Sequence, residues 1–124
     1  FCDAEIAMSA HVLFEAIDPY SAASTSKKLM DIIRDDIKFS GLLISDDISM
    51  AALPGDIKKR TTNLIEAGND VILHCNGKLF EMKEIVESGV VPNTLTLSRM
   101  SSVIEERKKI EHTKFENLES SQSS

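Results

Sequence analysis

Ten residues, Gly41–Met50, constrain the fold of this chain more than any other stretch. They begin with a short apolar run, Gly41–Ile44, and continue into two adjacent carboxylates, Asp46 and Asp47. A short apolar run bounded by turn signals is typical of a strand buried on both faces. The carboxyl ends of parallel strands are where α/β folds usually place their chemistry. One of these aspartates could act there as a nucleophile, a base or a metal ligand, or could only cap the next helix.

A pattern of strand followed by helix occurs three times along the chain. The strands are expected at residues 4–12, 41–44 and 71–75. Each is followed by a segment with helical spacing of apolar residues, at 27–37, 56–67 and 78–88. Ser24 or Ser26 can cap the first helix, while Gly68 and Gly89 are suited to end the other two. This order predicts an α/β fold of parallel strands joined by right-handed crossovers.

The remaining residues differ from this pattern. A fourth helix is predicted from Thr94 to about Glu111, with apolar residues on one face and a heavily charged second half. From Lys114 onward the chain is polar and ends in Ser-Ser-Gln-Ser-Ser, which buries too little apolar surface to order itself. We therefore expect one folded domain over residues 1–112 and a disordered tail over residues 113–124.

Composition and charge narrow the function classes. The 124 residues are 42% hydrophobic and carry a net charge of −6, which argues against a nucleic-acid partner. No apolar stretch approaches the ~20 residues that span a bilayer, so no membrane partner is expected. Cys2 and Cys75 lie in apolar stretches without metal-ligand spacing, which predicts reduced core thiols and a cytoplasmic location, with a single disulfide as the alternative. Phe1 in place of Met suggests a start inside a longer reading frame.

Several short motifs in one order carry a family resemblance. They are Met8–Val12, Ile17–Pro19, Ser24–Ser26, Ile33–Arg34, Phe39–Met50 and Ala67–Asn76. The series resembles the carboxyl-terminal part of bacterial family-3 glycoside hydrolases, over about residues 5–105. The branch it resembles is the β-N-acetylhexosaminidases that remove N-acetylglucosamine from cell-wall muropeptides during peptidoglycan recycling. Their catalytic domain is a (β/α)₈ barrel of the TIM type, and the three units here would correspond to its last three strands.

The resemblance also implies roles for single residues. Asp46 matches the family's nucleophile, which in a retaining glycosidase must be an ionised carboxylate below the anomeric carbon. Asp47 is expected to be a loop or cap residue. His11 would lie near the sugar subsite, or would be a hydrogen-bonded histidine packed at a strand end. Met50 could line the subsite or fill the core. The implied partner is a saccharide containing N-acetylglucosamine, and no cofactor or metal is expected.

The chain departs from the family pattern in what it lacks. The family's general acid/base and its Lys-His-Phe-Pro-Gly-His-Gly-type stretch would precede Phe1. General acid catalysis contributes about 10²–10⁴-fold, so the isolated chain is expected to be inactive. Three strand–helix units cannot close an eight-stranded barrel, and they leave open strand edges. The expected protein partner is therefore the missing amino-terminal half of the barrel or, failing that, another copy through self-association.

Two other functions compete with the hydrolase fragment. The chain could be an inactive, stand-alone α/β module that binds or assembles with a partner. Alternatively, Asp46, Asp47 and a nearby carboxylate could bind a divalent cation for phosphoryl chemistry. Against the second, no glycine-rich phosphate loop precedes any of the predicted helices.

Overall fold

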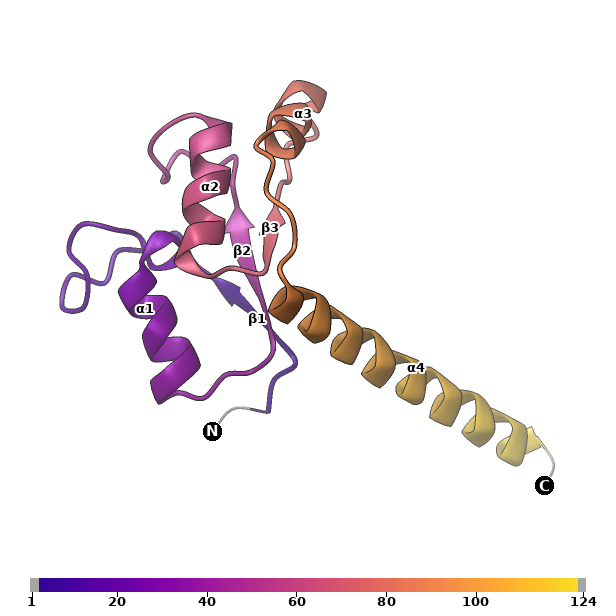
Figure 1. The fold of residues 1–124 in the computed structure, drawn as a ribbon. Coiled ribbons are helices and arrows are strands. Elements are labelled where there is room, and N and C mark those ends of the chain that lie inside the picture. Colours follow the sequence, from indigo (N-terminus) through magenta and orange to yellow (C-terminus); the bar gives the residue numbers. More distant parts are fainter. Residues whose placement is uncertain (1–2, 123–124) are drawn as a thin grey trace.

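The computed structural model describes residues 3–122 of the chain. Three strands, β1 (Ile6–Ser9), β2 (Leu42–Asp47) and β3 (Val71–Leu73), form a sheet in the order β1-β2-β3 (Figure 1). Both pairings are parallel, and β1 aligns with β2 so that Met8 lies opposite Ile44. The predicted α/β class with parallel strands is confirmed.

Helical segments connect the strands as the sequence predicts. The short η1 (Ala23–Thr25), α1 (Lys27–Asp31) and the π-helical η2 (Ile32–Asp36) lie between β1 and β2, and α2 (Ile57–Ala67) lies between β2 and β3. After β3 come α3 (Leu79–Glu87) and the long α4 (Thr94–Gln122), which runs away from the body of the molecule (Figure 1). The predicted helix 27–37 is therefore two segments, an α turn that widens into a π turn.

Side-chain caps explain where the helices begin and end. The Ser26 hydroxyl accepts a hydrogen bond from the Leu29 amide at 3.2 Å, and the Asp56 carboxylate accepts one from the Lys59 amide at 2.8 Å. Both bonds satisfy amide groups that have no partner inside the first turn of a helix. Gly68 ends α2 with a φ of 126°, a conformation that L side chains rarely adopt.

The core lies between the sheet and the helices α1 and α2. Met30, Phe39, Leu43 and Ala67 form one buried cluster around the middle strand. Ile48, Leu53 and Leu64 form a second cluster near the carboxyl ends of the strands. Burying a side chain of this size contributes roughly 1.5–3 kcal/mol.

The two faces of β1 differ in the exposure of their side chains. Ile6 and Met8 are 41% and 59% exposed, whereas Ser9 is buried. Side chains alternate between the two faces of a strand. One face of β1 is therefore covered by helices, and the other carries apolar side chains in contact with solvent.

Four sequence predictions need correction. β1 and β3 are shorter than expected, and β2 extends through both Asp46 and Asp47 rather than ending before them. Residues 113–122, predicted to be disordered, continue α4 without a break. Ion pairs at helical spacing, such as Lys109–Glu106 and His112–Glu116, accompany this extension.

The cysteine prediction also changes. Cys75 is exposed beyond the end of β3 rather than buried, because β3 stops at Leu73 and the chain turns there. Cys2 lies outside the described residues. Among residues 3–122, no helix combines the length and the apolar character that a membrane crossing requires.

Candidate active site

Asp46 and Asp47 are the last two residues of the middle strand. The pairing of β2 with β3 is irregular there, because Ile44 lies opposite Val71 while Asp47 lies opposite Leu73. One extra residue of β2 is thus accommodated between these pairs, which is a β-bulge. Bulges bend the strand and re-aim side chains, and they are over-represented next to active sites. The carboxyl end of β2 is therefore shaped differently from a regular strand end.

The two adjacent carboxylates have different surroundings. Asp47 accepts hydrogen bonds from the Ser49 amide at 3.0 Å, the Ser49 hydroxyl at 2.6 Å and the Cys75 amide at 3.1 Å. Asp46 accepts one bond from the amide of its own neighbour, Asp47, at 2.8 Å, and its side chain is half-buried. Asp47, expected to be a loop or cap residue, is instead the last residue of β2 and joins the ends of β2 and β3, while Asp46 keeps acceptor capacity for a ligand.

These hydrogen bonds also set the ionisation of Asp47. Burial by itself would raise the pKa of this carboxyl group. The bonds from the Ser49 hydroxyl, the Ser49 amide and the Cys75 amide outweigh that effect and hold the pKa of Asp47 below its usual value. Asp47 is thus an ionised anchor at neutral pH.

His11 binds the same segment from the loop after β1. Its Nε2 atom lies 2.9 Å from the Asp47 carbonyl oxygen, and its Nδ1 atom lies 2.6 Å from the Ser24 hydroxyl. Because a carbonyl oxygen can only accept, Nε2 carries a proton and donates it, and in a neutral ring Nδ1 accepts from Ser24. Both ring nitrogens are used within the chain, so the structure shows a hydrogen-bonded histidine at a strand end.

Asn69 extends this contact into the core, and sequence reasoning gave it no role. Its side chain accepts a bond from the Ser9 hydroxyl at 2.5 Å and donates to the carbonyl oxygens of Ser24 and Leu64, both at 2.7 Å. Asn69 is 4% exposed. A continuous network therefore runs from Asn69 through Ser24 and His11 to the backbone of Asp47. The signal in the sequence was a polar residue between a helix-ending glycine and a strand.

Met50 lies in the turn after β2 and is 42% exposed. A cavity of about 640 Å³ opens near this region, and it is lined by residues that include His11, Tyr20 and Pro54. Neither Asp46 nor Met50 lines that cavity. The structure therefore places Asp46, His11 and Met50 at the same end of the sheet without enclosing them in one pocket.

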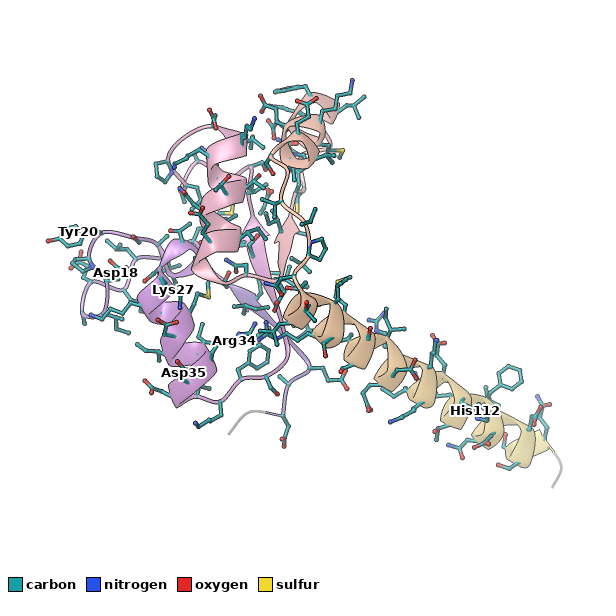
Figure 2. The ribbon with its side chains drawn as sticks, viewed as in Figure 1. Asp18, Tyr20, Lys27, Arg34, Asp35 and His112 are labelled. Carbon is teal, nitrogen blue, oxygen red and sulfur yellow. The ribbon has the colours of Figure 1, made fainter. Side chains whose placement is uncertain are left out.

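The long loop after β1 is held by Asp18. Its carboxylate accepts bonds from the amides of Tyr20 and Ser21 at 3.1 and 3.2 Å and from the Ser26 hydroxyl at 2.6 Å. The hydrogen bond from Ser26, followed by that from the Tyr20 amide, lowers the pKa of Asp18. Figure 2 shows Asp18 and Tyr20 in the part of this loop that projects away from the sheet. Asp18 thus joins the loop to the start of α1.

Another aspartate, Asp70, is buried just before β3, at the end of the sheet opposite to Asp46 and Asp47. Its oxygens accept from the Leu43 amide at 2.9 Å, the Thr96 hydroxyl at 2.8 Å, and Arg34 and Arg99, both at 2.7 Å. Arg34 reaches Asp70 from η2 and lies between that segment and the first turn of α4 (Figure 2). Asp70 thereby joins β2, η2 and α4.

The structure also tests the cation-binding alternative. Within residues 3–122, no three His, Cys, Asp or Glu side chains converge in a way that could hold a metal ion. His74 instead pairs with Glu81 at 2.8 Å, and this bond, followed by one from Asn76, lowers the pKa of Glu81. Asp46 and Asp47 therefore have no third ligand of this kind in the described part of the chain.

A family model and curated relatives match this chain and agree on one family. Residues 2–105 match the family model described as "Glycosyl hydrolase family 3 N terminal domain". A β-hexosaminidase of Idiomarina loihiensis is 40% identical over 73 residues, which are 57% of this chain and 22% of that protein. A β-hexosaminidase of Nitrosomonas eutropha is 42% identical over 71 residues, which are 56% of this chain and 20% of that protein.

Solved structures of similar proteins agree. A family-3 β-N-acetylglucosaminidase from Paenibacillus superimposes with a TM-score of 0.73 at 24% identity, covering 84% of this chain and 22% of that one. NagZ from Neisseria gonorrhoeae, solved in complex with zinc ion, gives a TM-score of 0.60 at 31% identity, covering 77% and 27%. The first likeness is evidence for the fold alone.

This chain spans about a fifth of the length of the curated relatives that it matches. The match nevertheless extends over most of the chain, from its first residues to the middle of α4. It includes β1, β2 and β3 together with the bulge that carries Asp46 and Asp47. On this evidence the chain belongs to glycosyl hydrolase family 3.

Proposed function

We propose that this chain is the part of a β-N-acetylhexosaminidase that supplies its nucleophile, Asp46. The whole enzyme would release terminal β-linked N-acetylglucosamine from cell-wall muropeptides in the cytoplasm, as a step of peptidoglycan recycling. Relatives that are 40% and 42% identical to this chain over 73 and 71 aligned residues are named β-hexosaminidases, which supports the sugar class. The three strand–helix units would be the last three of an eight-stranded barrel.

The observation that carries the proposal is the contrast between the two carboxylates at the end of β2. Asp47 is bonded to Ser49 and Cys75, whereas Asp46 accepts one bond, from an adjacent amide. A nucleophile needs an oxygen with a free lone pair and a fixed backbone beneath it. Asp46 has both, because the bonds of Asp47 hold the backbone that carries it.

The proposed reaction proceeds in two displacements. In the first, an Asp46 oxygen bonds to the anomeric carbon while the bond to the leaving oxygen breaks, and that oxygen takes a proton from an acid outside this chain. In the second, water attacks the glycosyl ester, the carboxylate leaves, and the same outside group takes the water's proton. The configuration at the anomeric carbon is retained because it is inverted twice.

His11 and Met50 would border the sugar subsite in this proposal. His11 uses both ring nitrogens within the chain, so its contribution would be to position the loop over Asp47 and to offer a ring face to the sugar. Met50 is 42% exposed in the turn after Asp46 and would offer an apolar contact. The walls that would complete the pocket would come from the remaining barrel units.

The test uses a longer polypeptide in which this chain follows the missing barrel units. In that protein, Asp46→Asn should lower hydrolysis of an aryl N-acetyl-β-glucosaminide by about 10³-fold or more, because an amide cannot form the glycosyl ester. Asp47→Asn is the matched variant, with the same chemical change one residue away, and should reduce the rate much less. Mass spectrometry of the quenched wild-type reaction should find the sugar on the peptide that contains Asp46.

Two outcomes would contradict the assignment. Similar, near-wild-type rates for both variants would remove Asp46 from the chemistry. A covalent sugar on another peptide would move the nucleophile elsewhere. Hydrolysis by the 124-residue chain alone, abolished by Asp46→Asn, would instead show that this chain also contains the acid, and His11 would be the first residue to test.

A further inference from the structure

The long helix α4 carries an apolar stripe that the rest of the chain does not cover. At 100° per residue, five apolar side chains fall within one narrow face of the helix. These residues are Leu97, Met100, Ile104, Phe115 and Leu118. Each of them is 37–68% exposed. We call these five residues the α4 stripe.

The stripe faces away from the body of the molecule. Ser98, Ser102 and Glu106 line a cavity together with residues 3–5, and helical spacing places these three on the other side of α4 from the stripe. Beyond Glu106 the helix leaves the body altogether, and Figure 2 shows His112 far from the sheet. The second half of α4 therefore has no packing surface in the described part of the chain.

A helix in this position needs a partner. Helices in water are marginal unless an amphipathic face is packed, since most helical stability in proteins comes from tertiary contacts. The intrahelical ion pairs on α4, such as Lys108–Glu105 at 3.7 Å, are exposed and contribute little. The apolar contacts that would stabilise residues 104–118 must come from another surface.

The charged residues between Ile104 and Phe115 indicate that the partner surface is a second copy of α4. Lys108 and Glu111 lie on the same face as the stripe, between its two apolar ends. When two copies of α4 are placed antiparallel, with the symmetry axis between residues 109 and 110, Lys108 of each copy faces Glu111 of the other. The same register places Ile104 against Phe115. Each copy thus supplies an opposite charge and an apolar contact to the uncovered face of the other.

A parallel arrangement is disfavoured by the same residues. In a parallel, in-register pair each Lys108 would face the other Lys108, and the two Glu111 side chains would also meet. Like charges at facing positions oppose pairing, and charged or polar residues in a helix seam select register and orientation at a cost in stability. The pattern therefore selects one orientation and predicts a moderate affinity rather than a permanent dimer.

We propose that α4 is a docking surface for a second copy of this chain, as an antiparallel helix pair with reciprocal Lys108–Glu111 contacts. The interface would be isologous, since the same patch is used by both copies. The stripe lies on the other side of α4 from the residues that line the cavity with residues 3–5, and it does not include the proposed nucleophile.

The experiment is sedimentation velocity of the full 124-residue chain over a wide range of protein concentration. We expect a concentration-dependent monomer–dimer equilibrium. Lys108→Glu and Glu111→Lys should each raise the dimer Kd about tenfold or more, because each places like charges in the seam. The double variant, Lys108→Glu with Glu111→Lys, should restore the wild-type Kd, since the reciprocal pairs re-form with exchanged signs.

Matched controls make the same charge changes away from the stripe. Lys109→Glu and Glu116→Lys lie on other faces of α4 and should dimerise like the wild type. Circular dichroism of every variant checks that helix content is unchanged. A chain that stays monomeric at all concentrations would overturn the proposal. Wild-type association in both single variants would overturn it, because the contact would then lie outside the α4 stripe. A double variant that is not restored would also overturn it, because Lys108 and Glu111 would then not pair reciprocally.

Discussion

The two ends of the sheet each carry an aspartate, and the two side chains lie in opposite environments. Asp46, at the carboxyl end of β2, is half-buried and accepts one hydrogen bond, from the amide next to it. Asp70, at the amino end of β3, has a side chain only 2% exposed and accepts from two arginines, a hydroxyl and an amide. The same residue type thus has free acceptor oxygens at one end and none to spare at the other.

This contrast separates a role in chemistry from a role in stability. In barrels of parallel strands, chemistry is placed at the carboxyl ends of the strands, while the amino ends contribute stability. Asp70 fits the second role because it joins β2, η2 and α4 through one carboxylate. Replacing each aspartate in turn tests whether the two ends of the sheet have these separate roles.

The largest effect on stability is expected from Asp70→Asn. This change leaves the half-buried Arg34 and Arg99 without their anion, and the loss of one partner from a buried ion pair costs about 3–5 kcal/mol. Urea denaturation of the 124-residue chain measures it. Asp46→Asn is the matched control and should alter the free energy of unfolding by no more than about 0.5 kcal/mol. Equal losses in both variants would erase the proposed division between the two ends.

Part of this loss of stability should also appear when Asp70 is protonated rather than replaced. Burial would raise the pKa of Asp70, but the bonds from the Leu43 amide, the Thr96 hydroxyl and Arg99 outweigh it and hold the pKa below its usual value. A carboxyl group whose pKa is lower in the folded state stabilises the fold above its unfolded pKa. That contribution is lost as pH falls through the folded pKa.

The measurement is the free energy of unfolding as a function of pH, from neutral pH into the acid range. The wild-type chain should lose stability below about pH 4 more steeply than Asp70→Asn, which has no such group to protonate. Asp18 and Asp47 remain in both proteins and contribute in the same direction, so the difference isolates Asp70. Parallel curves for the two proteins would remove Asp70 from the acid response.

A smaller effect than that of Asp70→Asn is expected at the Asp46 end, from His11→Ala. The change removes the bond to the Asp47 carbonyl oxygen and the contact with Ser24, for a net loss of about 1 kcal/mol. Hydrogen exchange should report faster opening of the Asp47–Ser49 turn with little change at Asp70. A loss comparable to that of Asp70→Asn would show that the two ends are not independent.

Local features explain which parts of the fold were predictable. Ser26 and Gly68 have side-chain or backbone chemistry that favours the start and the end of a helix, and the structure uses both in that way. Asp56, the first residue of the predicted second helix, caps it. The limits of the strands were less predictable. β2 continues through Asp46 and Asp47 because the Cys75 amide and a bulge hold them in the sheet, which no local pattern encodes.

The candidate site shows the same division. The sequence drew attention to Asp46 and Asp47 because these carboxylates follow an apolar run, and to His11 through the family resemblance. It did not indicate that Asn69 and Ser24 connect His11 to the core, since these residues are far apart along the chain. Nor did it assign a role to Asp70, whose partners come from β2, η2 and α4.

The order of strands and helices and the position of the two carboxylates could be predicted from the sequence, because hydrophobic period and capping chemistry act over a few residues. Which carboxylate is anchored and which has free oxygens became visible only in the folded chain. That difference depends on donors from distant segments, namely the Cys75 amide for Asp47 and Arg34, Thr96 and Arg99 for Asp70. A buried carboxylate must gather such donors to offset its desolvation, and folding alone brings them together.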